Sequence, residues 1–109
     1  MKRTFIEVPM FTKKWKDLGL TDDDLRLLED SLLQNPKLGD VIQGTGGLRK
    51  VRIPLSSHGK RGGGRVIYVD IEIKETIYFI NVYTKNEQDD LTPDEKKALK
   101  AVVKILKEE

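Results

Sequence analysis

The sequence predicts an α+β domain in which a small antiparallel sheet packs against three helices. Three observations lead to this fold class: apolar side chains recur with helical spacing over residues 11–34, strand-like runs occupy residues 49–83, and an amphipathic segment begins near residue 92. The 109 residues suffice for one domain with a modest core, and no repeat or linker divides them. We therefore expect one domain over residues 1–109 with the element order β-α-α-β-β-β-α.

The first two expected elements are a short strand and a short helix. Residues 4–8 alternate between polar and apolar side chains until Pro9, which indicates a strand that stops there. Apolar side chains then recur every three to four residues over residues 11–18, and Gly19 ends this helix. Because Trp15 is in register with the apolar stripe, we expect it to pack in the core and not to bind a ligand.

A second helix follows and completes a helical hairpin. Thr21 is suited to cap its N-terminus, and the aspartates at residues 22–24 suit the positive end of the helix dipole. The helix is expected to end near Asn35 and Pro36. The apolar residues expected on its buried face are Leu25, Leu28, Leu32 and Leu33.

Three strands form the expected sheet. A turn-rich connection over residues 39–47 precedes an alternating strand at residues 49–55. A polar glycine loop then leads to residues 65–73, which begin with apolar side chains on both faces and therefore predict a central strand. After a turn at Lys74 and Glu75, residues 77–83 return as the third strand of a meander.

The last expected element is a C-terminal helix. Thr92 and Glu95 form a capping box, and Pro93 between them occupies the first helical position. The apolar face expected for this helix comprises Ala98, Leu99, Val102, Ile105 and Leu106.

Charge is segregated along the chain. The formal net charge is only +2, from 20 basic and 18 acidic residues, yet residues 41–69 contain no acid. Eight of the nine glycines lie in or beside this stretch, a combination that favours a local anion site over a generally basic surface. A solvated basic loop is the alternative. The basic residues of the stretch are Arg49, Lys50, Arg52, Lys60, Arg61 and Arg65.

Composition also excludes several classes of protein. The absence of cysteine excludes disulfide scaffolds and zinc fingers, and the single histidine, His58, argues against a catalytic transition-metal site. No apolar run approaches the roughly 20 residues that span a bilayer, and residues 1–5 lack the apolar segment of a signal peptide. The glycine runs lack the spacing of nucleotide-binding loops. We expect a cytoplasmic protein with no metal, no small-molecule cofactor and no membrane association.

The basic stretch carries residue types that suit phosphodiester chemistry. Lys50 and Arg52 lie on one face of a strand, about 7 Å apart by strand geometry, and Arg65 opens the next strand. Guanidinium groups stabilise charge that builds on phosphoryl oxygens, and a lysine can act as a general base. Tyr83 and Lys85 end the third strand and can reach the same edge, where a tyrosine can stack on a base or donate a proton. Nucleic-acid binding, cleavage and a plain solvent-exposed strand face all remain open on these residues alone.

Four blocks of sequence, in this order, resemble the RelE/HigB family of toxin–antitoxin toxins, and most closely its HigB-like branch. The likeness extends over essentially the whole chain, helical hairpin and C-terminal helix included. The blocks are DVI at residues 40–42, GTGGLRK at 44–50, GKRGG at 59–63 with RVIY at 65–68, and KNEQDDLT at 85–92.

The resemblance implies a RelE-like fold and a ribosome-dependent endoribonuclease that cuts messenger RNA in the ribosomal A site, without a metal. It also implies a small antitoxin partner, often with a helix-turn-helix domain, in addition to the ribosome and mRNA. The family's basic strand pair falls on Lys50 and Arg52, its next arginine on Arg65, and its basic position after the last strand on Lys85.

The chain departs from the best-known members in two respects. Asn86 stands where they carry an arginine, and residues 86–109 contain no tyrosine, so Tyr83 or Tyr68 must supply any catalytic tyrosine. The catalytic residues that we expect are Lys50, Arg52, Arg65, Tyr83 and Lys85. The residues that we expect to contact RNA are Arg49, Lys60, Arg61 and Tyr68.

Two other functions compete with the ribonuclease toxin. A ParE-like inhibitor of DNA gyrase belongs to the same superfamily of folds, but it does not need a cluster of Lys50, Arg52 and Arg65 that suits phosphate cleavage. A non-enzymatic nucleic-acid-binding domain would use the same basic face without any chemistry.

Overall fold

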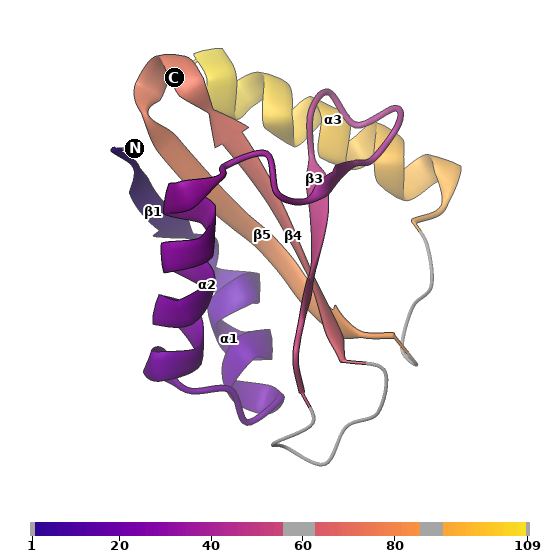
Figure 1. The fold of residues 1–109 in the computed structure, drawn as a ribbon. Coiled ribbons are helices and arrows are strands. Elements are labelled where there is room, and N and C mark those ends of the chain that lie inside the picture. Colours follow the sequence, from indigo (N-terminus) through magenta and orange to yellow (C-terminus); the bar gives the residue numbers. More distant parts are fainter. Residues whose placement is uncertain (1, 56–62, 86–90, 109) are drawn as a thin grey trace.

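A five-stranded sheet with the order β1-β5-β4-β3-β2 organises the part of the chain that the structure describes, and helices cover both of its faces (Figure 1). The structure, a computed structural model, describes residues 2–55, 63–85 and 91–108. In chain order, the elements are β1 (Thr4–Glu7), α1 (Pro9–Asp17), α2 (Asp22–Gln34), β2 (Asp40–Val41), β3 (Arg49–Ile53), β4 (Gly64–Ile71), the 3-10 turn η2 (Glu72–Lys74), β5 (Thr76–Thr84) and α3 (Pro93–Glu108).

The expected meander is present, but the sheet is not wholly antiparallel. The strands β3, β4 and β5 pair antiparallel in chain order, as predicted. β1 instead pairs parallel with β5, with Thr4 opposite Thr76. Alternation identifies a strand without identifying its partner or direction, so the sequence could not predict this pairing. The two-residue strand β2 lies within the expected turn-rich connection.

The helical hairpin packs on one face of the sheet, as predicted. The Thr21 capping box is formed, because its hydroxyl accepts from the Asp24 amide while the Asp24 carboxylate accepts from the Thr21 amide. Trp15 is buried in this core, and its indole N–H donates to the Thr21 carbonyl at 3.0 Å. Stacked aromatic rings join α1 to β5, with the centroids of Phe11 and Phe79 5.0 Å apart. The hairpin is thereby anchored to one half of the sheet.

The opposite face carries α3 over a second hydrophobic core. The capping box of Thr92 and Glu95 is formed as predicted. The predicted apolar face is wrong by part of a turn: Val103 is 2% exposed, whereas Val102 and Ile105 are 40% and 55% exposed. The helix touches the small sheet through a narrow stripe, which Val103 shares with the partly buried Leu99 and Leu106. No helix of the described residues is long and apolar enough to cross a membrane.

A buried ion pair fastens the start of the chain to the centre of the sheet. Arg3 Nε donates to Asp70 Oδ1 at 2.7 Å, and its Nη2 donates to Oδ2 at 3.3 Å. The two side chains are only 10% and 5% exposed, and the carboxylate raises the pKa of the Arg3 guanidinium. The pair joins the residue before β1 to β4, across the intervening β5.

We expect Arg3→Ala to lower the free energy of unfolding by about 3 kcal/mol, because it leaves the Asp70 carboxylate buried without its partner. Urea unfolding at pH 7 measures the change. Arg26→Ala is the control, since its pair with Asp23 is exposed on both sides and should contribute within about 0.5 kcal/mol. Equal losses in the two variants would contradict the anchoring role of Arg3.

Candidate functional site

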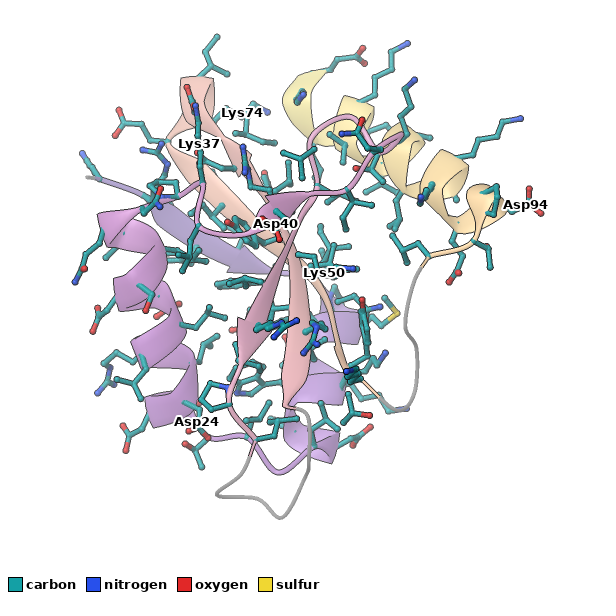
Figure 2. The ribbon with its side chains drawn as sticks, turned by 45° about the vertical axis from the view of Figure 1, so that its right-hand side comes forward. Asp24, Lys37, Asp40, Lys50, Lys74 and Asp94 are labelled. Atoms are coloured by element: carbon teal, nitrogen blue, oxygen red, sulfur yellow. The ribbon has the colours of Figure 1, made fainter. Side chains whose placement is uncertain are left out.

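Basic side chains gather on the face of the sheet that α3 flanks, at the end of the meander. Strand alternation puts Lys50 and Arg52 on this face of β3. Arg65 in β4 is directly opposite Arg52, and Tyr83 in β5 is directly opposite Arg65. The juxtaposition expected from the sequence is therefore present in the backbone register. Figure 2 shows Lys50 reaching away from β3 below α3.

The backbone hydrogen bonds bring Arg52 and Arg65 as close as a sheet allows. The Ile42 amide donates to the Leu48 carbonyl, so the polar groups of Leu48, and by alternation those of Arg52, point towards β2. Arg52 and Arg65 therefore form a non-hydrogen-bonded pair, the kind in which opposite side chains approach most closely. Like charges in such positions oppose strand pairing. The Arg65 guanidinium donates from Nη1 to the Gly64 carbonyl at 3.1 Å.

Glycine at the start of β4 makes this register possible. Gly63 has a φ of +66°, and a Cβ there would lie 2.7 Å from the Ile53 carbonyl oxygen. Only glycine tolerates both the left-handed backbone and the close approach of the two strands. The Lys85 amide donates to the Gly63 carbonyl at 3.5 Å, which brings Lys85, directly after β5, to the same end of the sheet.

A contact between α1 and β5 lies near this end of the sheet and was missed from the sequence. Asn81 is opposite Ile67, beside the register irregularity of the β4–β5 pair. Lys14 reaches it from α1, with its Nζ donating to Asn81 Oδ1 at 3.0 Å. Because 67 positions separate the two residues, no local pattern could have indicated the contact. Lys50, Arg52, Arg65 and Lys85 are called the cation cluster below.

The cation cluster has few acidic neighbours among the residues that the structure describes. Asp40 is opposite Lys50 across the β2–β3 pair, and Figure 2 shows these two side chains in the same part of the molecule. The described ion pairs all lie elsewhere, such as Lys37 with Glu72 at 3.3 Å. No group of three or more metal-ligating side chains occurs within residues 2–55, 63–85 and 91–108. The cluster is suited to binding an anion, with Asp40 at its margin.

The expected contact between Tyr83 and a base does not fit this structure. Tyr83 is 1% exposed and packs in the core beneath α3 together with Leu91 and Val103. Stacking on an RNA base needs a free ring face, which a buried ring does not offer. In this arrangement Tyr83 packs in the core next to the strand position of Arg65. The alternation of β5 placed its side chain correctly but could not show that α3 covers it.

Tyr68 and Arg49 also have structural roles where RNA contacts were expected. Tyr68 is fully buried; its hydroxyl donates to the Pro36 carbonyl at 2.8 Å and accepts from the Gly39 amide at 2.9 Å. Arg49 is opposite Tyr68, on the face away from the cation cluster, and donates to the Gly39 carbonyl at 2.7 Å. Both side chains thus hold the segment that joins α2 to β2. Lys60 and Arg61, the other expected RNA contacts, lie outside the described residues.

We expect the stability of the fold to decrease as the pH rises above about 10. Burial raises the pKa of the Tyr68 hydroxyl above its ordinary value of 10.0, although the hydrogen bond from Gly39 opposes part of this shift. The unfolded chain then loses this proton at lower pH than the folded protein does, so the stabilisation present below pH 10 is lost as the pH approaches the folded pKa.

Tyr68→Phe tests this pH dependence. The variant leaves the Pro36 carbonyl and the Gly39 amide without their partner, which should cost about 1–3 kcal/mol at pH 7. Its stability should then fall less steeply between pH 9.5 and 11 than that of the parent protein. Urea unfolding across this range measures both effects, and parallel curves for the two proteins would show that Tyr68 is not the titrating group.

Several solved structures have the same fold as this chain. A variant of the E. coli toxin RelE in which two arginines are replaced by alanine matches in its free state. The TM-score is 0.60 and the identity 17%, over 96% of this chain and 99% of that chain. The isolated E. coli RelE toxin matches with a TM-score of 0.56 and 18% identity, over 94% and 99% of the two chains. The intact E. coli RelBE toxin–antitoxin complex matches with a TM-score of 0.56 and 17% identity, over 77% and 96%.

Family comparison gives the same result at the level of sequence. Residues 3–109 match the family described as the RelE toxin of the RelE/RelB toxin–antitoxin system. The match includes the hairpin, the whole meander with the cation cluster, and α3. The expected RelE-like fold is therefore confirmed, and this chain belongs to the RelE toxin family.

Proposed function

We propose that this toxin is a metal-independent endoribonuclease that cuts messenger RNA held in the A site of the ribosome and so stops translation. The single observation that supports cleavage best is the direct cross-strand opposition of Arg52 and Arg65. Two guanidinium groups at that spacing suit the two free oxygens of one phosphodiester. The residues expected to act with them are Lys50 and Lys85.

The reaction that fits these residues is attack by the 2′-hydroxyl on the adjacent phosphorus. The 2′ oxygen forms the new bond, the bond to the 5′ oxygen breaks, and the products are a 2′,3′-cyclic phosphate and a 5′-hydroxyl end. Lys50 or Lys85 acts as the general base that accepts the 2′ proton, and a water molecule donates a proton to the 5′ oxygen as it leaves. Arg52 and Arg65 stabilise the charge on the pentacoordinate phosphorus.

The ribosome supplies what the cation cluster lacks. A flexible RNA strand seldom aligns its 2′-hydroxyl with the phosphorus, and holding it in line contributes several orders of magnitude to such reactions. Asn81, held by Lys14, adds an amide that can bind a base or ribose at the margin of the cluster. This proposal places the toxin in the cytoplasm, with its ribosome and its antitoxin.

The antitoxin is the second partner in this proposal. The intact E. coli complex joins the RelE toxin to its antitoxin RelB, and the family to which this chain belongs is defined by that partnership. We propose that the antitoxin of this chain covers the cation cluster or displaces α3. Either event would prevent binding of mRNA, because both α3 and the cluster lie on the same face of the sheet.

Arg65→Ala should reduce cleavage by about 100- to 1,000-fold, because removal of one preorganised charge donor typically has that effect on the rate. A purified translation reaction with a defined mRNA, in which new 3′ ends are mapped, measures the change. Arg26→Ala is the matched control, since its side chain is 71% exposed on α2. A folded Arg65→Ala protein with near-normal activity would exclude the proposed role.

A gyrase inhibitor or a plain binding domain gives a different result in the same reaction. Either would leave the mRNA intact at any toxin concentration, and only a gyrase inhibitor would block DNA supercoiling. Cuts without ribosomes would instead indicate a general ribonuclease and contradict the orienting role of the A site.

The chemical step can be tested through the mRNA itself. A single 2′-deoxy nucleotide before the scissile phosphate should abolish cleavage at that site, because the attacking group is gone. A phosphorothioate at the same phosphate should slow cleavage without rescue by Mn²⁺ or Cd²⁺, since no metal contacts the phosphate oxygens. Rescue by a thiophilic metal ion would contradict metal independence, and cleavage of the deoxy mRNA would exclude 2′-hydroxyl attack.

A further inference from the structure

The helix α3 has three sides of different character. Its narrow apolar stripe packs on the sheet, and Val102 and Ile105 lie exposed on a second side. The third side is a row of four lysines with 3-4-3 spacing, which places all of them within one stripe about 15 Å long. These residues, Lys97, Lys100, Lys104 and Lys107, are all exposed and are called the lysine ridge below.

A shelf lies along the lysine ridge. All four lysines line a hollow of about 400 Å³ between α3 and the loop before β3, with Gly46 on the loop side. Lys107 Nζ donates to the Gly46 carbonyl at 2.9 Å, which fixes the loop against the helix. Gly46 has a φ of +77°, so the loop passes close to Lys100 and Val103 without a side chain between. The ridge is thus part of a shaped surface, not only one side of a solvated helix.

The charge of the ridge works against the helix that carries it. No acidic residue occurs between Lys96 and Lys107. The lysines of the ridge, three or four positions apart, therefore repel one another. A bound polyanion would remove this repulsion.

The chemistry of the ridge favours RNA over an acidic protein. Protein interfaces are depleted in lysine and concentrate aromatic and apolar anchors at their centre. The ridge has no aromatic residue, and the apolar side chains of its shelf are only Ala101 and Val103. Double-stranded RNA is bound chiefly through its phosphates and its shape, for which a row of flexible point charges is well suited.

The position of the ridge relates it to the cation cluster. α3 flanks the face of the sheet that carries the cluster, and the loop of Gly46 leads through Leu48 into Lys50. Figure 2 shows Lys50 below α3 on this side of the molecule. RNA held along the ridge would therefore lie beside the strand face on which the mRNA is cut.

From these observations we infer that the lysine ridge of α3 binds the phosphate backbone of a ribosomal RNA duplex and so docks the toxin over the A site. The inference rests on the proposed function, because it assigns a ribosomal contact to a toxin that acts there. Its role is binding and orientation, and the chemical step belongs to the cation cluster.

The test compares two variants with the same change in charge. Lys100→Glu with Lys104→Glu reverses the centre of the ridge, and Lys13→Glu with Lys16→Glu makes the same change at exposed positions of α1. Cosedimentation with purified ribosomes gives the affinity over a range of salt concentrations, and the translation reaction gives the cleavage rate at saturating toxin. Far-ultraviolet circular dichroism checks the helix. Lys100→Gln with Lys104→Gln provides a neutral variant in case the double reversal unfolds α3.

The ridge variant should bind ribosomes at least tenfold more weakly than the α1 variant, with a slope of log affinity against log salt that is smaller by about 2. Cleavage at saturating toxin should remain near normal, since the cation cluster is intact. Equal binding by the ridge and α1 variants would overturn the inference and leave the proposed nuclease standing. Loss of antitoxin binding with normal ribosome binding would overturn it in favour of a protein partner. A wild-type toxin that neither binds ribosomes nor cuts mRNA would overturn both proposals.

Discussion

The pairing of β4 with both β3 and β5 is the constraint on which the rest of the structure depends. β4 buries apolar side chains on both faces, so it must be covered from both sides, by the hairpin on one and by α3 on the other. Its first residues extend to the end of the sheet where Arg65 meets Arg52. The same strand therefore divides the two cores and carries Arg65. A substitution that weakened β4 would disturb fold and site together.

What the sequence could predict was mainly local. Capping boxes at Thr21 and Thr92 and the alternation of the meander depend on residues a few positions apart, and both were found. The core of the cation cluster was also predictable, because Arg52 and Arg65 are brought together by a single hairpin. The parallel pairing of β1, the contact of Lys14 with Asn81 and the burial of Tyr83 all depend on elements distant in sequence. Side-chain type alone also could not separate Tyr68, which ties α2 to β2, from a tyrosine that faces RNA.

The distribution of charge separates stability from function along the chain. Where charge serves the fold, it is paired and shielded, as Arg3 with Asp70. Elsewhere basic residues are grouped in long stretches of sequence that contain no acid, as in residues 41–69 and again from Lys96 to Lys107. Such stretches oppose folding through repulsion, and the two hydrophobic cores must compensate for it. The small net charge of +2 conceals this arrangement, since the acidic residues lie largely on other elements.

The parallel pairing of β1 with β5 affects how the chain folds during its synthesis. β1 is synthesised before its partner in the sheet, and Arg3 before its partner Asp70, which lies 67 positions later. Contacts of such long range are slow to form and must await the whole intervening sequence. Every nascent chain that stops short of β5 lacks both the sheet edge that receives β1 and the strand that backs Arg65. A chain that ends before β5 therefore cannot form the central part of this sheet.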